Sequence, residues 1–171
     1  LLLAWRDGDK RAGKELFARY YDLVARFFSN KVSSDKADLV QSTFMACLEK
    51  VDQLRNAASF RSFLFSIARF ELLHYYRRKH RREVAFDSDD VSICDLDPSP
   101  SAVMAKHQEQ RLLLEGLRRI PVDLQIVLEL SYWEKMSTTE IAGVLDIARD
   151  SAFARRYRGA IQGQSYCHHW V

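Results

Sequence analysis

The sequence has few of the residues that break helices or cross-link a small domain. Its 171 residues include 6 glycines, 3 prolines and 3 cysteines. An all-β chain needs many turns, and so few glycines and prolines do not supply them. The cysteines, Cys47, Cys94 and Cys167, are odd in number and far apart, which argues against a disulfide framework and suits a reducing compartment. These absences favour an all-helical protein.

Long apolar runs are absent as well. No stretch approaches the roughly 20 apolar residues that cross a bilayer, and no signal peptide is visible. We therefore expect a cytoplasmic protein without a membrane-inserted segment.

The chain does contain 47% hydrophobic residues and charge arranged in blocks. Apolar residues recur mainly at intervals of three and four, which is the period of a helix. The net charge is only +3, but residues 75–82 read Tyr-Tyr-Arg-Arg-Lys-His-Arg-Arg, whereas residues 87–97 hold five aspartates and no basic residue. The small net charge therefore conceals one basic and one acidic segment.

The acidic segment lies in a predicted flexible linker, residues 83–100, where the periodicity stops and Pro98 and Pro100 interrupt any helix. Two small helical domains, of three and four helices, are expected on either side of it, with a tail at 163–171.

Helix start and stop signals divide these domains further. The first domain, residues 1–82, is predicted to hold helices at 9–30, at 35–54 with Ser34 as cap, and at 59–82. The second, residues 101–162, is predicted to hold a helix from Ser101 to about Arg119, one that begins at Pro121 and ends near Trp133, and two more after residue 136.

Residues 137–162 have the pattern of a helix-turn-helix. Ser137 and Glu140 form a capping box, and Ile141 and Leu145 give the first helix an apolar face. Asp146 is placed for the turn, because aspartate tolerates a left-handed backbone. The next helix carries four arginines suited to phosphates and guanine edges: Arg149, Arg155, Arg156 and Arg158. This predicts DNA binding; the alternative is a solvated basic helix in a bundle.

The helix predicted at 59–82 is aromatic at its start and basic at its end. Its phenylalanines are Phe60, Phe63, Phe65 and Phe70. Aromatic rings stack on unpaired bases while arginines and lysines follow the backbone, which indicates single-stranded nucleic acid. Alternatively the rings are core and the arginines complement the helix C-terminus. We expect at least two of the four rings to be core.

Four segments stand in a characteristic order: Asp38-Leu-Val-Gln-Ser-Thr-Phe44, Ser59-Phe-Arg-Ser-Phe-Leu-Phe-Ser-Ile-Ala-Arg69, Leu117-Arg-Arg-Ile-Pro121 and residues 137–145. Their order and spacing resemble the extracytoplasmic-function (ECF) sigma factors, the small alternative sigma factors of bacterial RNA polymerase in the sigma-70 superfamily. The resemblance implies a sigma2-like domain that binds core polymerase and melts the minus-10 element. It also implies a sigma4-like domain that reads the minus-35 element.

Matched residue by residue, the resemblance assigns three surfaces. The first would bind the clamp helices of the largest polymerase subunit: Asp38, Leu39, Gln41 and Phe44. The second would hold minus-10 DNA: Asn56, Arg61, Arg69, Phe70, His74, Arg77 and Arg78. The third would contact minus-35 DNA: Arg149, Ser151, Arg155, Tyr157 and Arg158. For Leu39 and Phe44 the alternative is a place in the core.

The chain departs from the family pattern in both domains. Phe70 stands where asparagine is frequent, and His74 where an acid is frequent, so the minus-10 base preference is open. Ala152 and Arg156 replace the usual valine and leucine of the buried face of the recognition helix, and Ala148 replaces a proline. Either the helix is rotated so that it packs through Phe153, Tyr157 and Ile161, or it is poorly docked.

The resemblance further implies the polymerase flap and an anti-sigma factor as partners, duplex and single-stranded promoter DNA as ligands, and no cofactor. Cys167, His168 and His169 lack a fourth ligand, so no metal site is expected. Two other classes remain open. One is a conventional helix-turn-helix regulator that binds duplex DNA without polymerase. The other is a nuclease using the acids of 87–97, but catalysis needs rigidly positioned groups, and these lie in a proline-broken segment.

Overall fold

The computed structural model of the protein describes residues 1–54, 56, 59–80, 87–99, 108–155 and 158. Within these ranges all the secondary-structure elements are helices, and one isolated β-bridge joins Ser92 to Pro121. The predicted all-α class is therefore confirmed. Within the same ranges, no helix combines the length and apolar character that crossing a membrane requires.

Among the described residues of the first half, four α-helices and one 3-10 turn have described bounds. They are α1 (Leu2–Arg6), α2 (Lys10–Ser29), α3 (Lys36–Lys50), the 3-10 turn η1 (Val51–Gln53) and α4 (Phe60–Lys79). The helices predicted at 9–30, 35–54 and 59–82 are confirmed to within a few residues. The short α1 was not predicted, because five residues carry little periodicity.

The start of α2 is fixed by Asp9 and Gly13. The Asp9 carboxylate accepts hydrogen bonds from the backbone N–H groups of Arg11 and Ala12, which satisfies two of the free donors at the helix start. Trp5 of α1 lies over Gly13, where an added Cβ would be 2.5 Å from its Cδ1 atom. The indole also meets the Phe17 ring edge to face at 5.1 Å. A glycine at 13 therefore lets α1 lie against α2.

The second half contains α5 (Ile93–Leu96), α6 (Gln108–Arg119), α7 (Val122–Tyr132) and α8 (Thr138–Leu145), and residues 149–155 are helical. Ser137 and Glu140 form the predicted capping box at the start of α8. Asp146 ends it in the left-handed conformation, with φ 56°. The helix-turn-helix prediction is thus confirmed in its caps and in its turn.

Two predicted caps are wrong. Asp35, not Ser34, occupies the N-cap position of α3, with φ 60° and no side-chain bond to the helix, and the Ser34 hydroxyl donates to the Asp35 carboxylate instead. Pro121 is the N-cap of α7 and not its first helical residue. The predicted cap Ser101 lies outside the described residues.

The predicted linker without structure is wrong for residues 87–99. Ser92 and Asp95 form a capping box that starts α5, and Ile93 and Leu96 are buried at 0% and 1% exposure. The Val122 N–H donates to the Val91 carbonyl, which ties the segment to the start of α7. The apolar residues at 91, 93 and 96, which stand among the aspartates, were the sequence signal that this segment packs against the core.

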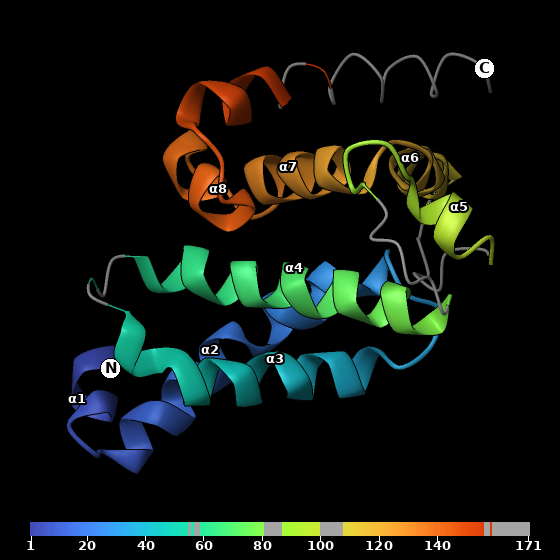
Figure 1. Ribbon diagram of the computed structural model, residues 1–171. Coiled ribbons are helices and arrows are strands. Elements are labelled where there is room, and N and C mark those ends of the chain that lie inside the picture. The colour runs from blue at the N-terminus through green and yellow to red at the C-terminus, as the bar shows by residue number, and fades with distance from the viewer. Residues whose placement is uncertain (55, 57–58, 81–86, 100–107, 156–157, 159–171) are drawn as a thin grey trace.

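The two halves pack on each other over a continuous core. Figure 1 shows α4 between α3 on one side and α7 and α8 on the other, and α4 contacts both α3 and α8. Buried residues from both halves belong to one hydrophobic cluster, including Leu64, Phe65 and Leu72 of α4 and Ile126, Leu130, Ile141 and Val144 of the second half. A smaller cluster joins α6 to α7.

Candidate nucleic-acid interface

One face of α4 presents aromatic rings to solvent. Phe70 is 53% exposed, and its ring stacks on that of His74, one helical turn further along, with centroids 6.0 Å apart and planes at 23°. The Lys50 ammonium of α3 lies 5.5 Å from the Phe70 centroid. A flat ring pair beside a cation is suited to a nucleobase, because the base stacks while its phosphate meets the ammonium.

The other phenylalanines of α4 have a structural role. Phe60 and Phe65 are buried at 3% and 0% exposure, and Phe63 is half-buried against the same cluster. The expectation that at least two of the four rings belong to the core is confirmed. Phe70 is the one of the four that is exposed.

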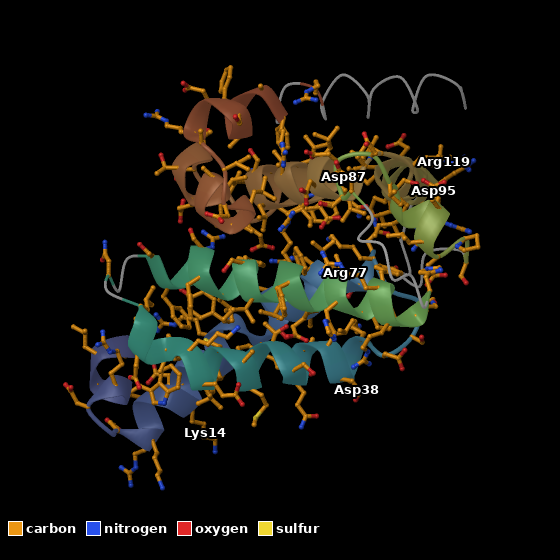
Figure 2. All side chains as sticks on the ribbon, viewed as in Figure 1. Lys14, Asp38, Arg77, Asp87, Asp95 and Arg119 are labelled. Carbon is orange, nitrogen blue, oxygen red and sulfur yellow. The ribbon has the colours of Figure 1, made fainter. Side chains whose placement is uncertain are left out.

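The basic end of α4 is divided between solvent and the molecular interior. Arg78 is exposed, whereas Arg77 is half-buried on the side of α4 that faces the second half, as Figure 2 shows. Lys79 reaches the carboxylate of Asp97 at 3.4 Å. Asn56, in the loop before α4, is exposed.

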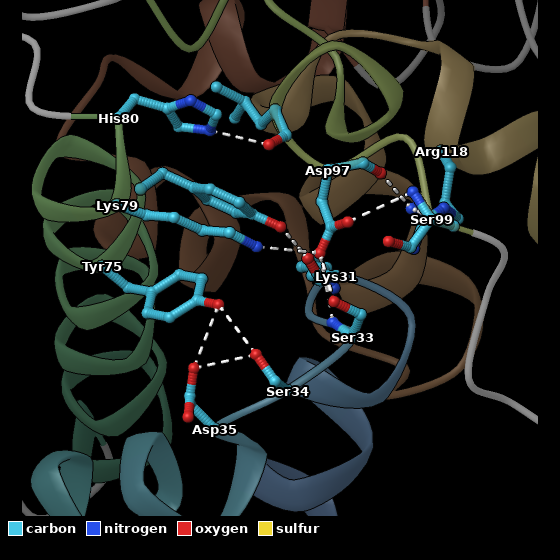
Figure 3. A network of polar contacts seen from close by, with 12 residues as sticks. Lys31, Ser33, Ser34, Asp35, Tyr75, Lys79, His80, Asp97, Ser99 and Arg118 are labelled. Carbon is cyan, nitrogen blue, oxygen red and sulfur yellow. Dashed lines mark hydrogen bonds and ion pairs between the residues drawn. The ribbon is translucent and has the colours of Figure 1, made fainter.

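Asp97 lies at the centre of a polar network around the end of α4 (Figure 3). Its carboxylate accepts from the Ser33 hydroxyl at 2.6 Å, and its backbone carbonyl accepts from Arg118, which also donates to the Ser99 carbonyl. Burial alone raises the pKa of Asp97, but hydrogen bonds from Ser33 and Ser99 outweigh it and hold that pKa well below its usual range. The network joins α4, α6 and the segment before α3.

Two of the predicted minus-10 arginines are engaged inside the molecule. Arg69 donates from Nε and Nη2 to the two carboxylate oxygens of Asp123, both at 2.8 Å. Arg61 donates to the backbone carbonyl of Glu134, and its Nη2 lies 3.5 Å from that residue's carboxylate. Both side chains are therefore occupied by acids of the second half.

The helix at 149–155 exposes part of the predicted minus-35 surface. Arg149, Ser151 and Arg158 are exposed, and Tyr157 lies outside the described side chains. Arg155 is instead paired with Asp89 and, at 3.3 Å, with Asp123. The arrangement leaves Arg149 and Arg158 open to a ligand while Arg155 is held.

The rotated packing, one of the two alternatives for this helix, is wrong at Phe153. Ala152 is buried at 1% exposure, whereas Phe153, the first residue of the alternative packing stripe, is 62% exposed. The helix thus packs through the small residue at the position where the family has a valine. Ala152 belongs to the shared hydrophobic cluster.

The predicted polymerase-binding residues of α3 are also divided. Asp38 and Gln41 are exposed, and Figure 2 places Asp38 on the side of α3 away from α4. Leu39 is buried at 7%, and Phe44 is half-buried, its ring edge to face with Phe17 at 5.1 Å. The core alternative is confirmed for Leu39. Sequence reasoning overlooked two exposed apolar side chains of the same helix, Met45 at 51% and Leu48 at 40%.

Sequence reasoning also overlooked the acids that hold the arginines. We call Asp123, Glu129 and Glu134 the acidic set; their side chains are 3%, 3% and 7% exposed. Every residue of α7 from Val122 to Leu130 is buried. A carboxylate inside such an apolar helix has to find a partner, because an unpaired buried charge is costly. That requirement was the available signal, but it does not name the partner.

Lys31 provides one of these partners. Its side chain is 0% exposed, and its ammonium pairs with Glu129 and donates to the Phe27 carbonyl at 2.7 Å. Burial lowers the pKa of Lys31, against the opposing attraction of Glu129. An ion pair thus crosses between the halves within the core.

Known proteins are similar to this chain in sequence and in fold. Residues 16–82 match the family model of sigma-70 region 2. The ECF RNA polymerase sigma-E factor of Escherichia coli K12 is 28% identical over 160 residues, which cover 88% of this chain and 84% of that protein. The ECF RNA polymerase sigma-E factor of Haemophilus influenzae is 26% identical over 163 residues, covering 90% of this chain and 86% of that protein. The chain is therefore similar to ECF sigma factors over most of its length.

Two solved structures share the fold of this chain. The sigma factor RpoE in complex with the anti-sigma factor NepR from Bartonella quintana superimposes with a TM-score of 0.70 at 18% identity, over 91% of this chain and 96% of that one. CnrH in complex with the cytosolic domain of CnrY gives 0.63 at 23% identity, over 96% and 92%. Both likenesses extend over the two halves.

Proposed function

We propose that this chain acts as an alternative sigma factor that binds core RNA polymerase, recognises promoters and directs transcription initiation. One observation carries the proposal: a single chain joins an exposed, cation-flanked ring pair on α4 to a helix-turn-helix with exposed arginines. The first surface suits unpaired bases and the second suits duplex DNA. A protein that opens promoters needs both.

In the minus-10 role, Phe70 and His74 receive bases that leave the stack, and Arg78 follows the strand's phosphates. Asn56 lies in the loop before α4, where an amide can hydrogen-bond the edge of a flipped base. Arg61, Arg69 and Arg77 complete this surface. Stacking contributes about 1–3 kcal/mol per base, so several captured bases offset the few kcal/mol that unpairing costs, without nucleotide hydrolysis.

In the minus-35 role, the helix at 149–155 enters the major groove. Arg149, Ser151 and Arg158 are exposed for this contact, and Arg155 and Tyr157 belong to the same surface. Guanidinium groups bind guanine edges and phosphates in a bidentate manner.

In the polymerase-binding role, α3 offers Asp38 and Gln41 beside exposed Met45 and Leu48. Phe44 contributes the half-buried edge of this surface. An apolar surface with a flanking acid fits a helical partner such as the clamp helices.

The proposed sigma factor works in the cytoplasm with the polymerase and has no catalytic activity of its own. Three of the five acids of 87–97, which a nuclease would need, have structural partners: Asp89 pairs with Arg155, Asp95 completes a capping box and Asp97 accepts from Ser33. An anti-sigma factor is the expected regulator, since one solved structure of this fold is a sigma factor in complex with an anti-sigma factor.

Run-off transcription tests the proposal. Core polymerase, the purified chain and a library of promoter fragments should give defined start sites that core polymerase alone does not give. A gel shift distinguishes the conventional regulator: a sigma factor binds promoter DNA tightly only with core polymerase, whereas a regulator binds its operator alone. Tight operator binding without new start sites would overturn the proposal.

A further inference from the structure

The helix at 149–155 holds one large apolar ring in solvent. Phe153 is 62% exposed, the highest value for a large apolar side chain in the described part of the chain. Figure 1 shows this helix at the outer edge of the second half, beyond α8 as seen from α4. Removing a phenyl ring from water is favourable, so a partner that covers Phe153 gains binding free energy.

Phe153 shares its side of the helix with an arginine proposed for DNA. Ala152 faces the core at 1% exposure, so the other sides of the helix point outward. Arg149 precedes Phe153 by four residues, which places the two on one helix face. Ser151 and Ala154 are also exposed, and their short side chains allow the helix to come close to a base edge. A helix that enters the major groove with Arg149 therefore brings the Phe153 ring with it.

The charges around the ring favour nucleic acid as its partner. Arg149 and Arg158 are exposed on either side of Phe153 in the sequence, and guanidinium groups bind phosphates. Asp150 is exposed at the start of the helix, where an acid complements the helix dipole. An apolar ring between two arginines matches the major groove, which is bordered by phosphates and exposes base edges between them.

Thymine is the base that carries an apolar group on its major-groove edge. Its C5-methyl group projects into the groove, whereas the other bases present hydrogen-bond donors and acceptors there. A phenyl ring forms no conventional hydrogen bonds, so it gains from the methyl group and leaves donors and acceptors unsatisfied. The ring therefore distinguishes thymine from the other bases.

We propose that Phe153 determines specificity in the minus-35 surface by selecting thymine through its C5-methyl group. The inference rests on the proposed function and deepens it, because it names a base that the recognition helix reads. Arg149 and Arg158 contact phosphates or guanine edges, and Phe153 adds a preference that arginine does not have. The contact requires duplex DNA, so it plays no part in the binding of a single-stranded minus-10 oligonucleotide.

Deoxyuridine substitution tests the contact with the wild-type protein. Deoxyuridine lacks only the C5-methyl group of thymidine and keeps its hydrogen-bonding groups. Each thymine of the minus-35 region, on either strand, is replaced in turn in a promoter fragment identified by run-off transcription. Binding of the holoenzyme, which is core polymerase with the full chain, is measured by fluorescence anisotropy.

At one or two positions the affinity should fall about fourfold, which is the contribution of burying one methyl group. Equal affinities for every fragment would overturn the proposal, as would a minus-35 element with no thymine on either strand.

Two variants show whether Phe153 is the residue that reads the methyl group. Phe153→Ala should bind the thymine fragment about fourfold more weakly than the wild type and should no longer respond to deoxyuridine at the sensitive position. Leu3→Ala is the control, because Leu3 of α1 is 61% exposed and lies outside the helix-turn-helix. It should keep the full response. A response that persists in Phe153→Ala would assign the contact to another residue and overturn the proposal.

Phe153→Arg should change the base preference. A guanidinium group pairs with O6 and N7 of guanine. Replacing the sensitive T·A pair by G·C should therefore weaken binding by the wild type and strengthen binding by Phe153→Arg. An unchanged preference for thymine in Phe153→Arg would contradict the assignment.

Run-off transcription with the same holoenzymes separates this inference from the proposed function. Start sites directed by the wild type, together with no response to deoxyuridine, would leave the sigma-factor function standing and remove only the thymine contact. A wild type that directs no initiation with any promoter would remove the proposed function itself.

Discussion

Lys31 and Glu129 form an ion pair across the two halves with side chains 0% and 3% exposed. Glu129 also accepts from Gln125 Nε2 at 2.8 Å, and the Lys31 ammonium lies 4.2 Å from the centroid of the Phe27 ring. Each charge is thus compensated only by groups within the core. Removing one partner leaves the other without compensation.

Replacing Glu129 alone should therefore be costly. We expect Glu129→Leu to lower the free energy of unfolding by about 3–5 kcal/mol, whereas Lys31→Met with Glu129→Leu should be close to neutral or stabilising. Urea denaturation followed by circular dichroism measures both. Equal losses in the single and double variants would show that the packing of Glu129, and not its charge, matters.

Acid should weaken the network around Asp97. The pKa of Asp97 is lowered in the folded protein, so its stabilisation is present above the ordinary value of 3.8 and is lost as the pH falls below it. Asp97→Asn should cost about 1–3 kcal/mol at neutral pH, because Ser33 and Lys79 lose a charged acceptor. Thermal melts should show the difference from wild type shrinking below pH 3.8. A difference that stays constant down to pH 2 would contradict this reading.

Phe70 should matter for nucleic acid and little for folding. Because its ring is 53% exposed, Phe70→Ala should leave the melting temperature nearly unchanged. It should weaken binding of a single-stranded minus-10 oligonucleotide by about 1–3 kcal/mol, the contribution of stacking on one base. Phe153→Ala, which removes a ring that is 62% exposed outside α4, is the control. Equal effects of the two substitutions would argue against base stacking on Phe70.

Alanine should have opposite effects at two helical glycines. At Gly13 the new Cβ would meet Trp5 at 2.5 Å, so overpacking should lower stability by about 1–3 kcal/mol. At Gly143 of α8 the nearest atom would be the Ser62 Cβ at 3.7 Å, an ordinary contact, so better helix propensity should raise stability by up to about 1 kcal/mol. Differential scanning calorimetry of both variants measures the contrast. A stabilised Gly13→Ala would show that Trp5 moves aside freely.

Local signals in the sequence predicted the helices well. Ser137 and Glu140 predict the start of α8 because the capping box involves residues three apart, and Asp146 predicts its end because aspartate tolerates a left-handed backbone. Ser34 failed as a cap because the chain turns through a left-handed Asp35, which residue type alone does not determine. The resemblance supplied the order of the domains and the identity of the surfaces.

Sequence reasoning did not predict which acids pair with the arginines of the predicted DNA-binding surfaces. Arg69 and Asp123 are 54 residues apart and Arg61 and Glu134 are 73 apart, so no local pattern pairs them. Composition made α4 basic and α7 mainly apolar, but only packing shows that the few acids of α7 meet those arginines. The same holds for α5, since the aspartates of 87–97 concealed the apolar residues that dock the segment.

The burial of α5 determines how the heat capacity would change if the two halves of this chain rearranged. Ile93 and Leu96 lie within the shared core at 0% and 1% exposure, as do Ile126 and Ile141 on the facing helices. Separating the halves would hydrate this hydrocarbon surface, which raises the heat capacity. In calorimetric titrations, a partner that pulls the halves apart should therefore give a positive heat-capacity contribution that offsets the negative heat-capacity change of forming its own interface. A partner that binds the closed form should give only the negative heat-capacity change.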